Sequence, residues 1–166
     1  MSILPEKIYE LAAQVIEQAK AKGISIATAE SCTGGLIGGA LTDVSGSSAV
    51  VDRGFITYTN KAKMQVLGVS AETLREVGAV AEKTAREMAI GAIRKSASEL
   101  SVAVTGIAGP GGSDYKPGGR VHLATANLNG VLEHRKMDYG DIGRDKVRIA
   151  TIITALEMLL NAIDGA

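Results

Sequence analysis

A serine followed by two glycines is the feature of this sequence best suited to nucleophilic catalysis. Ser31 lies in the segment TAESCTGG, residues 28–35. If a helix opens here, the backbone N–H groups after the serine are unpaired and carry partial positive charge; they belong to Thr33, Gly34 and Gly35. The hydroxyl could then act as a nucleophile while the N–H groups stabilise an oxyanion. A serine that only caps the helix is the alternative interpretation.

A serine nucleophile needs a base, and a lysine is the best candidate for it. Lys61, which closely follows Tyr58, is our preferred base, with Lys63 as the second choice. Burial or a neighbouring cation lowers the pKa of a lysine enough for it to take a proton, whereas a solvated lysine at the start of a helix would have no such role. His122 and His134 fall within predicted strands. Neither histidine is placed for a Ser-His arrangement.

A second glycine-rich segment, TGIAGPGGSDYKPGG at residues 105–119, offers many backbone N–H groups and the hydroxyl of Thr105. Such a loop can cradle a phosphate or a carboxylate. It matches neither GxxxxGK[ST] nor GxGxxG, which argues against an ATP or dinucleotide site. Arg144 and Arg148 are four residues apart and would share one helix face; there they could bind a phosphate or form surface ion pairs. The sequence shows no clustered metal ligands, so we expect no metal and no cofactor.

The hydrophobic pattern predicts alternating helices and strands followed by a late hairpin. Helices are expected over residues 5–22, from Ser31 or Thr33 to 41, and over 61–67, 70–78, 82–95 and 143–163; strands over 24–28, 49–59, 100–105, 121–128 and 131–137. This order predicts a single domain, residues 1–166, with a three-layer α/β/α sandwich and a mostly parallel mixed sheet of about five strands. Parallel strands would bring both glycine-rich segments to the same edge of the sheet.

Composition favours a soluble, cytoplasmic protein. The chain has 166 residues, 46% of them hydrophobic, a formal net charge of zero and 3% aromatic residues. Zero charge and few aromatics argue against direct nucleic-acid binding. No apolar run approaches the roughly 20 residues of a membrane helix. Residues 1–10 have no basic segment followed by an apolar run, so they do not resemble a secretory signal. Cys32, the single cysteine, excludes an internal disulfide; it is either a rival nucleophile or a small buried apolar residue.

These motifs together resemble the CinA C-terminal domain family, also called nicotinamide-nucleotide amidase. The resemblance runs from about Pro5 to Ile163 and rests on residues 28–35, 46–48, 53–58, 60–61, 63, 67–69, 78–80, 88–89, 91–92, 105–112 and 116–117 and on the spacing of Arg144 and Arg148. Relatives usually continue Lys-Pro-Val-Gly-Thr-Val where this chain has Lys-Pro-Gly-Gly-Arg-Val at 116–121. This departure predicts a more flexible loop with a bulky cation at its exit.

The resemblance implies hydrolysis of the carboxamide of nicotinamide mononucleotide, giving nicotinic acid mononucleotide and ammonia, in NAD recycling. We expect the stand-alone form, since some relatives carry an additional N-terminal domain. In the predicted mechanism Ser31 attacks after Lys61 takes its proton, directly or through Tyr58, and Thr105 orients the substrate or relays a proton. The predicted binding residues are Thr33, Gly34, Gly35, Ser48, Gly106, Ala108, Gly109, Gly111, Arg144 and Arg148.

Two other functions fit the same sequence. One is a non-catalytic nucleotide-binding or regulatory module linked to competence or DNA damage, and the other is a partner-binding domain. The final apolar helix and the alanine-rich helix faces would support a homodimer, although core packing explains them equally well.

Overall fold

The protein is built on one five-stranded mixed sheet with the strand order β2-β1-β3-β4-β5. The computed structural model describes residues 2–113 and 115–166. The strands are β1 (Ile26–Glu30), β2 (Val51–Ile56), β3 (Leu100–Gly106), β4 (Arg120–Asn127) and β5 (Gly130–Asp138). β1 pairs in parallel with β2 and β3, and β4 is antiparallel to both of its neighbours. β4 is therefore the one strand that runs against the others, as predicted for a late hairpin.

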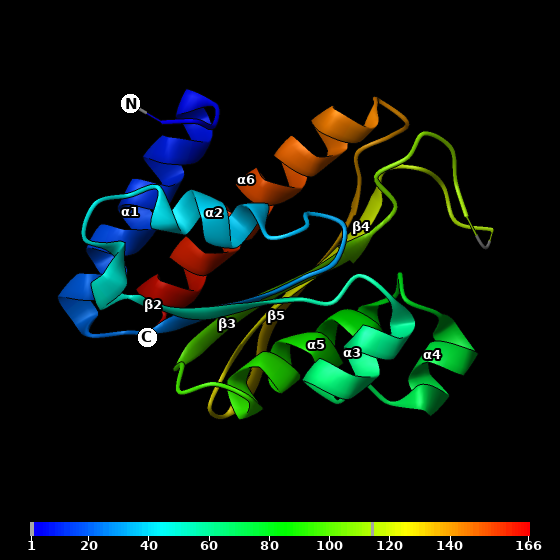
Figure 1. The fold of residues 1–166 in the computed structure, drawn as a ribbon, viewed down its shortest axis with the longest axis horizontal. Coiled ribbons are helices and arrows are strands. Elements are labelled where there is room, and N and C mark those ends of the chain that lie inside the picture. Colours follow the sequence, from blue (N-terminus) through cyan, green and yellow to red (C-terminus); the bar gives the residue numbers. More distant parts are fainter. Residues whose placement is uncertain (1, 114) are drawn as a thin grey trace.

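Helices cover both faces of this sheet, which confirms the predicted three-layer sandwich (Figure 1). The helices are α1 (Glu6–Lys22), α2 (Leu36–Thr42), α3 (Asn60–Leu67), α4 (Ala71–Val77), α5 (Glu82–Arg94) and α6 (Arg144–Asp164), with a 3-10 turn, η1, at Ser47–Ala49. One apolar core lies between the sheet and α1, α2 and α6, and a second lies between the sheet and α3, α4 and α5. The two cores fix the helices on opposite faces.

Local sequence signals account for where these elements begin and end. Gly23 ends α1 with a φ of +67°, a conformation that costs glycine little. Every residue of β1 is buried and β3 is buried from Leu100 to Thr105, as expected for central strands covered on both faces. The turn that joins β4 to β5 falls at Leu128 and Asn129, one residue earlier than the predicted Asn129–Gly130, and Gly130 opens β5 with a φ of +128°.

The carboxyl ends of the parallel strands position three loops along one edge of the sheet. β1 leads into residues 31–35, β2 into residues 57–59 and β3 into the glycine-rich residues 107–119. This arrangement confirms that the two glycine-rich segments meet at one edge, and that the segment after β2, residues 58–63, reaches the same edge, as its place after the second predicted strand indicates. It is the edge at which open α/β sheets bind ligands.

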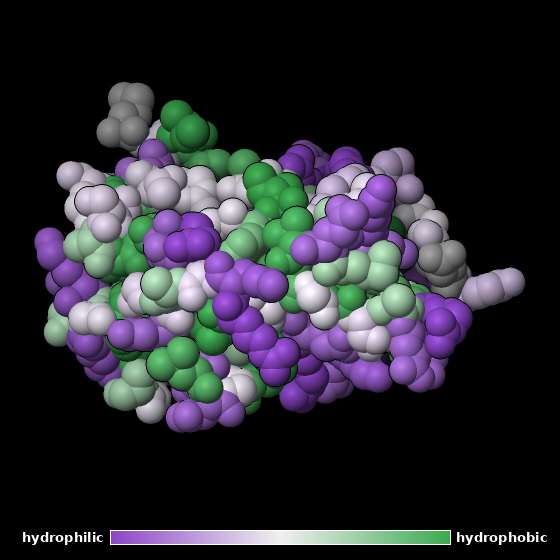
Figure 2. Space-filling view, turned by 60° about the horizontal axis from the view of Figure 1, so that its bottom comes forward, coloured by the Kyte–Doolittle hydropathy of each residue, from purple (hydrophilic) through white to green (hydrophobic). Residues whose placement is uncertain are grey.

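The surface shows no extended apolar face in the view of Figure 2, where hydrophobic groups are separated by hydrophilic ones. Scattered apolar side chains are normal on a surface in contact with water. Within residues 2–113 and 115–166, the helices are all too short or too polar to cross a membrane.

Candidate active site

A direct contact between Ser31 and Lys63 forms the centre of the site. Ser31 follows β1 at once, and its N–H donates to the carbonyl oxygen of Val104 on β3 at 3.1 Å, so the serine is fixed to the sheet. Lys63 comes from α3 and is only 1% exposed. Its Nζ donates to Ser31 Oγ at 2.9 Å. A hydroxyl and an amine at this distance can exchange a proton.

The environment of Lys63 favours its neutral form. Nζ also donates to the carbonyl oxygens of Thr57 at 2.9 Å and Tyr58 at 3.1 Å. Burial lowers the pKa of Lys63 from 10.5 to about 8, because the charged amine has lost water. Among the described residues no carboxylate forms an ion pair with it. The lysine is thus able to act as a base near neutral pH.

Lys61 does not take this position, although it was the preferred base from the sequence. Its side chain is exposed, whereas Lys63 is buried. Two residues along an α-helix are separated by about 200° around the axis, so α3 points these lysines to opposite sides. The packing of α3 against α5, through Leu67, turns Lys63 inward. The second choice of base is therefore the residue that meets Ser31.

The carboxylate of Glu30 accepts the hydrogen bonds that fix the segment after Ser31. This carboxylate, 1% exposed, accepts hydrogen bonds from the N–H groups of Ile37 and Gly38, each at 2.9 Å. It also accepts from the hydroxyls of Thr33 at 2.6 Å and Thr28 at 3.2 Å. A carboxylate in this place satisfies the first unpaired N–H groups of α2 and complements the positive end of its dipole.

The predicted start of this helix at Ser31 or Thr33 is therefore wrong. α2 begins at Leu36, and a carboxylate rather than a serine hydroxyl caps it. The Ser31 hydroxyl is left free for Lys63. The N–H of Gly34 donates to the Ser31 carbonyl at 3.0 Å, while those of Thr33 and Gly35 find no acceptor among the described residues. These two N–H groups remain candidates for an oxyanion site.

Arg144 and Arg148, the two arginines of α6, donate hydrogen bonds to different loops. Arg148 donates to the carbonyl oxygens of Cys32 at 3.1 Å and Thr33 at 3.4 Å, so it holds the loop that carries Ser31. Arg144 donates to the carbonyl oxygen of Gly109 at 2.9 Å and to the hydroxyl of Tyr58 at 3.0 Å. Only Arg144 of this pair lines the cavity described next.

A cavity of about 380 Å³ opens over Ser31 and Lys63. The other lining residues come from the loops after β1 and β2, the segment before α5, the end of β3, the glycine-rich loop and α6: Cys32, Tyr58, Ala79, Val80, Thr105, Gly106, Ile107, Ala108, Gly109, Pro110, Gly111, Gly112, Ser113, Lys116 and Arg144. Five of the predicted binding residues line this cavity: Gly106, Ala108, Gly109, Gly111 and Arg144. Thr33, Gly34 and Gly35 belong to the loop that carries Ser31, and Arg148 holds that loop in place. Ser48 instead lines a separate cavity beside β2.

One wall of the cavity is tied to the glycine-rich loop by side chains. Thr105 Oγ1 donates to the carbonyl oxygen of Ala79 at 2.8 Å. Lys116 Nζ donates to those of Val77 at 2.7 Å and Val80 at 2.6 Å. Lys116 is not among the site residues predicted from the sequence. Its position in the family motif at 116–117 is the feature that could have indicated a role at the site.

The glycine-rich loop is closely packed at Gly118, where this chain departs from its relatives, and at Gly119, which it shares with them. A Cβ on Gly118 would lie 2.7 Å from the carbonyl oxygen of Gly111, and one on Gly119 would lie 2.1 Å from that of Gly140. Glycine at these positions lets two backbone segments approach each other. Arg120 pairs with Asp138 on β5 at 2.8 Å, and it does not line the cavity.

The remaining titratable candidates are unsuited to the chemistry. Burial raises the pKa of the Cys32 thiol to about 11, so the reactive thiolate is scarce at neutral pH. His122 Nδ1 lies 3.0 Å from His134 Nε2 between β4 and β5, and burial lowers the pKa of His122 to about 4. Neither histidine lines the cavity, in agreement with the sequence-based expectation.

Comparison with known proteins places the chain in a family. The model of the CinA C-terminal domain matches residues 8–163. The chain belongs to the CinA C-terminal domain family. Among members of that family, it is 45% identical to the nicotinamide-nucleotide amidohydrolase PncC of Escherichia coli K12 over 92% of this chain and 93% of the relative. It is likewise 45% identical to PncC of Enterobacter agglomerans, over 93% of this chain and 94% of the relative.

Solved structures of CinA-type proteins have the same fold. The competence/damage inducible protein CihA of Agrobacterium tumefaciens superposes with a TM-score of 0.94 at 58% identity, covering 99% of both chains. A CinA superfamily protein of Klebsiella pneumoniae superposes with a TM-score of 0.91 at 32% identity, covering 96% of this chain and 99% of that one.

Proposed function

We propose that this protein hydrolyses the carboxamide of nicotinamide mononucleotide to nicotinic acid mononucleotide and ammonia. The observation that carries the proposal is the 2.9 Å contact between Ser31 Oγ and the buried amine of Lys63. The relatives named nicotinamide-nucleotide amidohydrolase, aligned over more than nine tenths of both chains, support the substrate.

The first step makes the serine a nucleophile. In neutral Lys63 the two N–H bonds donate to the carbonyl oxygens of Thr57 and Tyr58, which leaves the nitrogen lone pair for the Ser31 proton. As Nζ takes this proton, Oγ attacks the carboxamide carbon and the C=O electron pair moves onto oxygen. The N–H groups of Thr33 and Gly35 stabilise the oxyanion in the proposed geometry.

In the second half of the reaction, Lys63 donates the proton that it took from Ser31. The tetrahedral intermediate collapses as the Lys63 ammonium protonates the departing nitrogen, so that ammonia leaves and an ester on Ser31 remains. Water then gives a proton to Lys63 and attacks the ester carbon. The Lys63 ammonium passes that proton to the departing Ser31 Oγ, which releases the carboxylic acid and regenerates the serine and the neutral lysine. One amide and one water are consumed for each acid and ammonia formed. Because Nζ touches Oγ directly, this route needs no relay through the Tyr58 hydroxyl.

The rest of the cavity has groups that can bind the phosphate of a mononucleotide. Arg144 supplies a guanidinium at the opening, and the glycine-rich loop supplies backbone groups from Gly106 to Gly111. A phosphate can bind to both by charge-assisted hydrogen bonds. Thr105, fixed to Ala79, shapes the floor on which the pyridine ring would lie. The volume of about 380 Å³ is within the range of small-molecule sites.

The direct test measures ammonia release from nicotinamide mononucleotide by the purified protein, with and without a chelator. Release that survives chelation in the natural protein and falls at least about a thousandfold in Ser31→Ala supports a serine amidase. Binding of the nucleotide without release would instead favour the non-catalytic nucleotide-binding module. The Ser31→Ala variant should keep the thermal unfolding temperature of the parent within a few degrees.

A further inference from the structure

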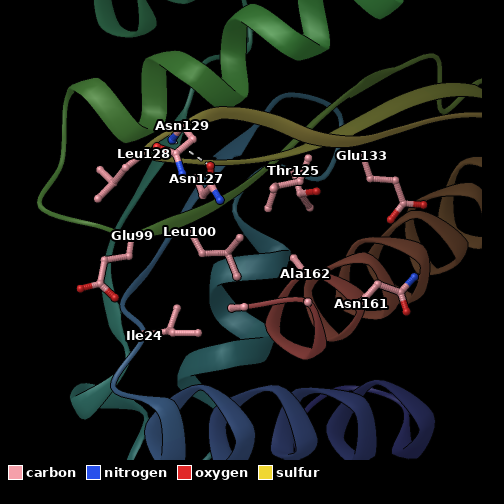
Figure 3. A pocket seen from close by; sticks show the side chains of 13 residues that line it. Ile24, Glu99, Leu100, Thr125, Asn127, Leu128, Asn129, Glu133, Asn161 and Ala162 are labelled. Atoms are coloured by element: carbon pink, nitrogen blue, oxygen red, sulfur yellow. Dashed lines mark hydrogen bonds between the residues drawn. The ribbon is translucent and has the colours of Figure 1, made fainter.

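A second and larger cavity lies at the opposite end of the sheet (Figure 3). It has a volume of about 580 Å³ and forms where the start of β3, the β4–β5 turn and the last turns of α6 meet. Strand β3 reaches both cavities, since Leu100 lines this one and Thr105 lines the one over Ser31. Five residues of extended strand separate them by about 17 Å, so the cavity is distinct from the candidate active site.

Apolar side chains that belong to neither core line this cavity. Leu128 is 72% exposed and Leu132 is 47% exposed, and both border the cavity beside Leu100 and Ala162. The pairing of β4 with β5 shifts between Thr125 and its neighbour, so Leu132 is the extra residue of a bulge. Bulges re-aim side chains and are common beside binding sites.

A hydroxyl in the cavity wall has no partner. Thr125 is fully buried, and among the described residues nothing forms a hydrogen bond with its Oγ1. Figure 3 shows Thr125 between the strands and α6, close to Leu100. A buried hydroxyl without a partner costs stability, and a ligand group that donates to it or accepts from it would remove that cost.

Charge limits which ligand fits. The ionisable side chains that line the cavity are Glu99 and Glu133, and no lysine, arginine or histidine is among the lining residues. Glu133 is paired with Arg135 at 2.6 Å, whereas Glu99 is exposed and has no such partner among the described residues. Asn161 and Ala162, near the negative end of α6, also line the cavity. These groups disfavour an anion such as a nucleotide phosphate.

We propose that this cavity is a binding site for a small amphipathic amine or alcohol. The apolar body of the ligand packs between Leu100, Leu128 and Leu132, and its uncharged or cationic head group meets Thr125 Oγ1 on the Glu133 side, since Thr125 pairs with Glu133 across β4 and β5. The site is independent of the proposed amidase activity, because it is built from the other end of the sheet.

The test compares three probes that share one benzene ring and differ in head group: benzylamine, benzyl alcohol and benzoate. Each is titrated into the isotope-labelled full chain while backbone amide signals are followed by NMR. We expect saturable shifts at Leu100, Thr125 and Leu132 for the amine and the alcohol, with a Kd of about 1 mM or below, and none for benzoate. Equal binding of benzoate, or shifts that map elsewhere or never saturate, would overturn the proposal.

Variants separate this site from non-specific binding. Ala162→Leu fills the cavity and should abolish the shifts, whereas undiminished affinity in this variant contradicts the proposal. Thr125→Val removes the unpartnered hydroxyl, so it should raise the unfolding temperature of the free protein and weaken probe binding at least fivefold. Thr151→Val is the matched control, because it removes a buried hydroxyl that is bonded to the Val147 carbonyl outside the cavity. It should leave probe affinity unchanged.

Discussion

Lys63 Nζ lies 2.9 Å from Ser31 Oγ, although 32 residues separate the two in the chain. The contact depends on the parallel pairing of β1 with β2, which brings the loop after each strand to one edge of the sheet. α3 follows the second loop and delivers the lysine to the serine.

The rate of amide hydrolysis should depend on pH through Lys63. The base must be neutral in the free enzyme, and burial places its pKa at about 8. We therefore expect kcat/KM for nicotinamide mononucleotide to rise about tenfold per pH unit below this value and to level off above it. Initial rates of ammonia release from pH 6 to 10 measure the profile. A rate that falls as pH rises through 8 would contradict neutral Lys63 as the base.

Lys63 and Lys61 form a matched pair for testing the identity of the base. Lys63→Met keeps a long apolar stem but removes the amine, so ammonia release should fall by about a thousandfold or more. Lys61→Met changes an exposed side chain and should retain activity within about threefold. The opposite ranking of the two variants would restore Lys61 as the base.

The stability of the same variants should also depend on pH. The pKa of Lys63 is lowered in the folded protein to about 8, against 10.5 for an unperturbed lysine. Between these values the unfolded chain binds a proton that the folded chain does not, so stability increases as pH rises from about 8 to about 10.5. Thermal unfolding should show the natural protein gaining stability relative to Lys63→Met across this window. Parallel curves for the two proteins would show that the pKa is not lowered.

The order of elements could be predicted because it depends on local patterns. The helix periodicity, the buried strands and the Asn129–Gly130 turn signal each act over a few residues, and together they specified the three-layer sandwich. The choice between Lys61 and Lys63 could not be made in this way. Both follow the same strand, and only the packing of α3 against α5 decides which one faces Ser31.

The start of α2 at Leu36 could not be predicted from local sequence either. Ser31 and Thr33 are common helix caps, whereas Glu30 reaches forward over seven and eight residues to the N–H groups that it satisfies. The cavity beside Thr125 was invisible for a similar reason, because it forms where β3, the β4–β5 turn and α6 converge from distant parts of the chain.

Arg144 and Arg148 should give different kinetic defects. Arg144 lines the cavity, whereas Arg148 donates to the carbonyl oxygens of Cys32 and Thr33. If Arg144 binds the phosphate, Arg144→Met should raise KM for the mononucleotide about tenfold or more and reduce the preference for it over nicotinamide riboside, which lacks the phosphate. Arg148→Met should lower kcat for both substrates and keep that preference. Exchange of these two patterns would assign the phosphate to Arg148.

Cys32 should be dispensable for the reaction. Burial raises its pKa to about 11, so the thiol stays protonated at the pH where Lys63 acts. Cys32→Ala should retain activity within a few fold, and iodoacetamide should modify the natural protein far more slowly than a free thiol at pH 8. Loss of activity in Cys32→Ala together with activity in Ser31→Ala would make the cysteine the nucleophile.

Glu30 should support catalysis by positioning the loop that carries Ser31, without touching the substrate. Glu30→Gln places an amide N–H₂ group among donors, namely the N–H groups of Ile37 and Gly38 and the Thr33 hydroxyl. We expect a loss of about 2 kcal/mol in the free energy of unfolding, measured by urea denaturation. We also expect a fall in kcat with little change in KM, because the proposed oxyanion donors shift while the phosphate site is retained. Glu76→Gln, at an exposed position on α4, is the control and should change neither quantity. An unchanged kcat in a destabilised Glu30→Gln would show that the carboxylate serves α2 alone.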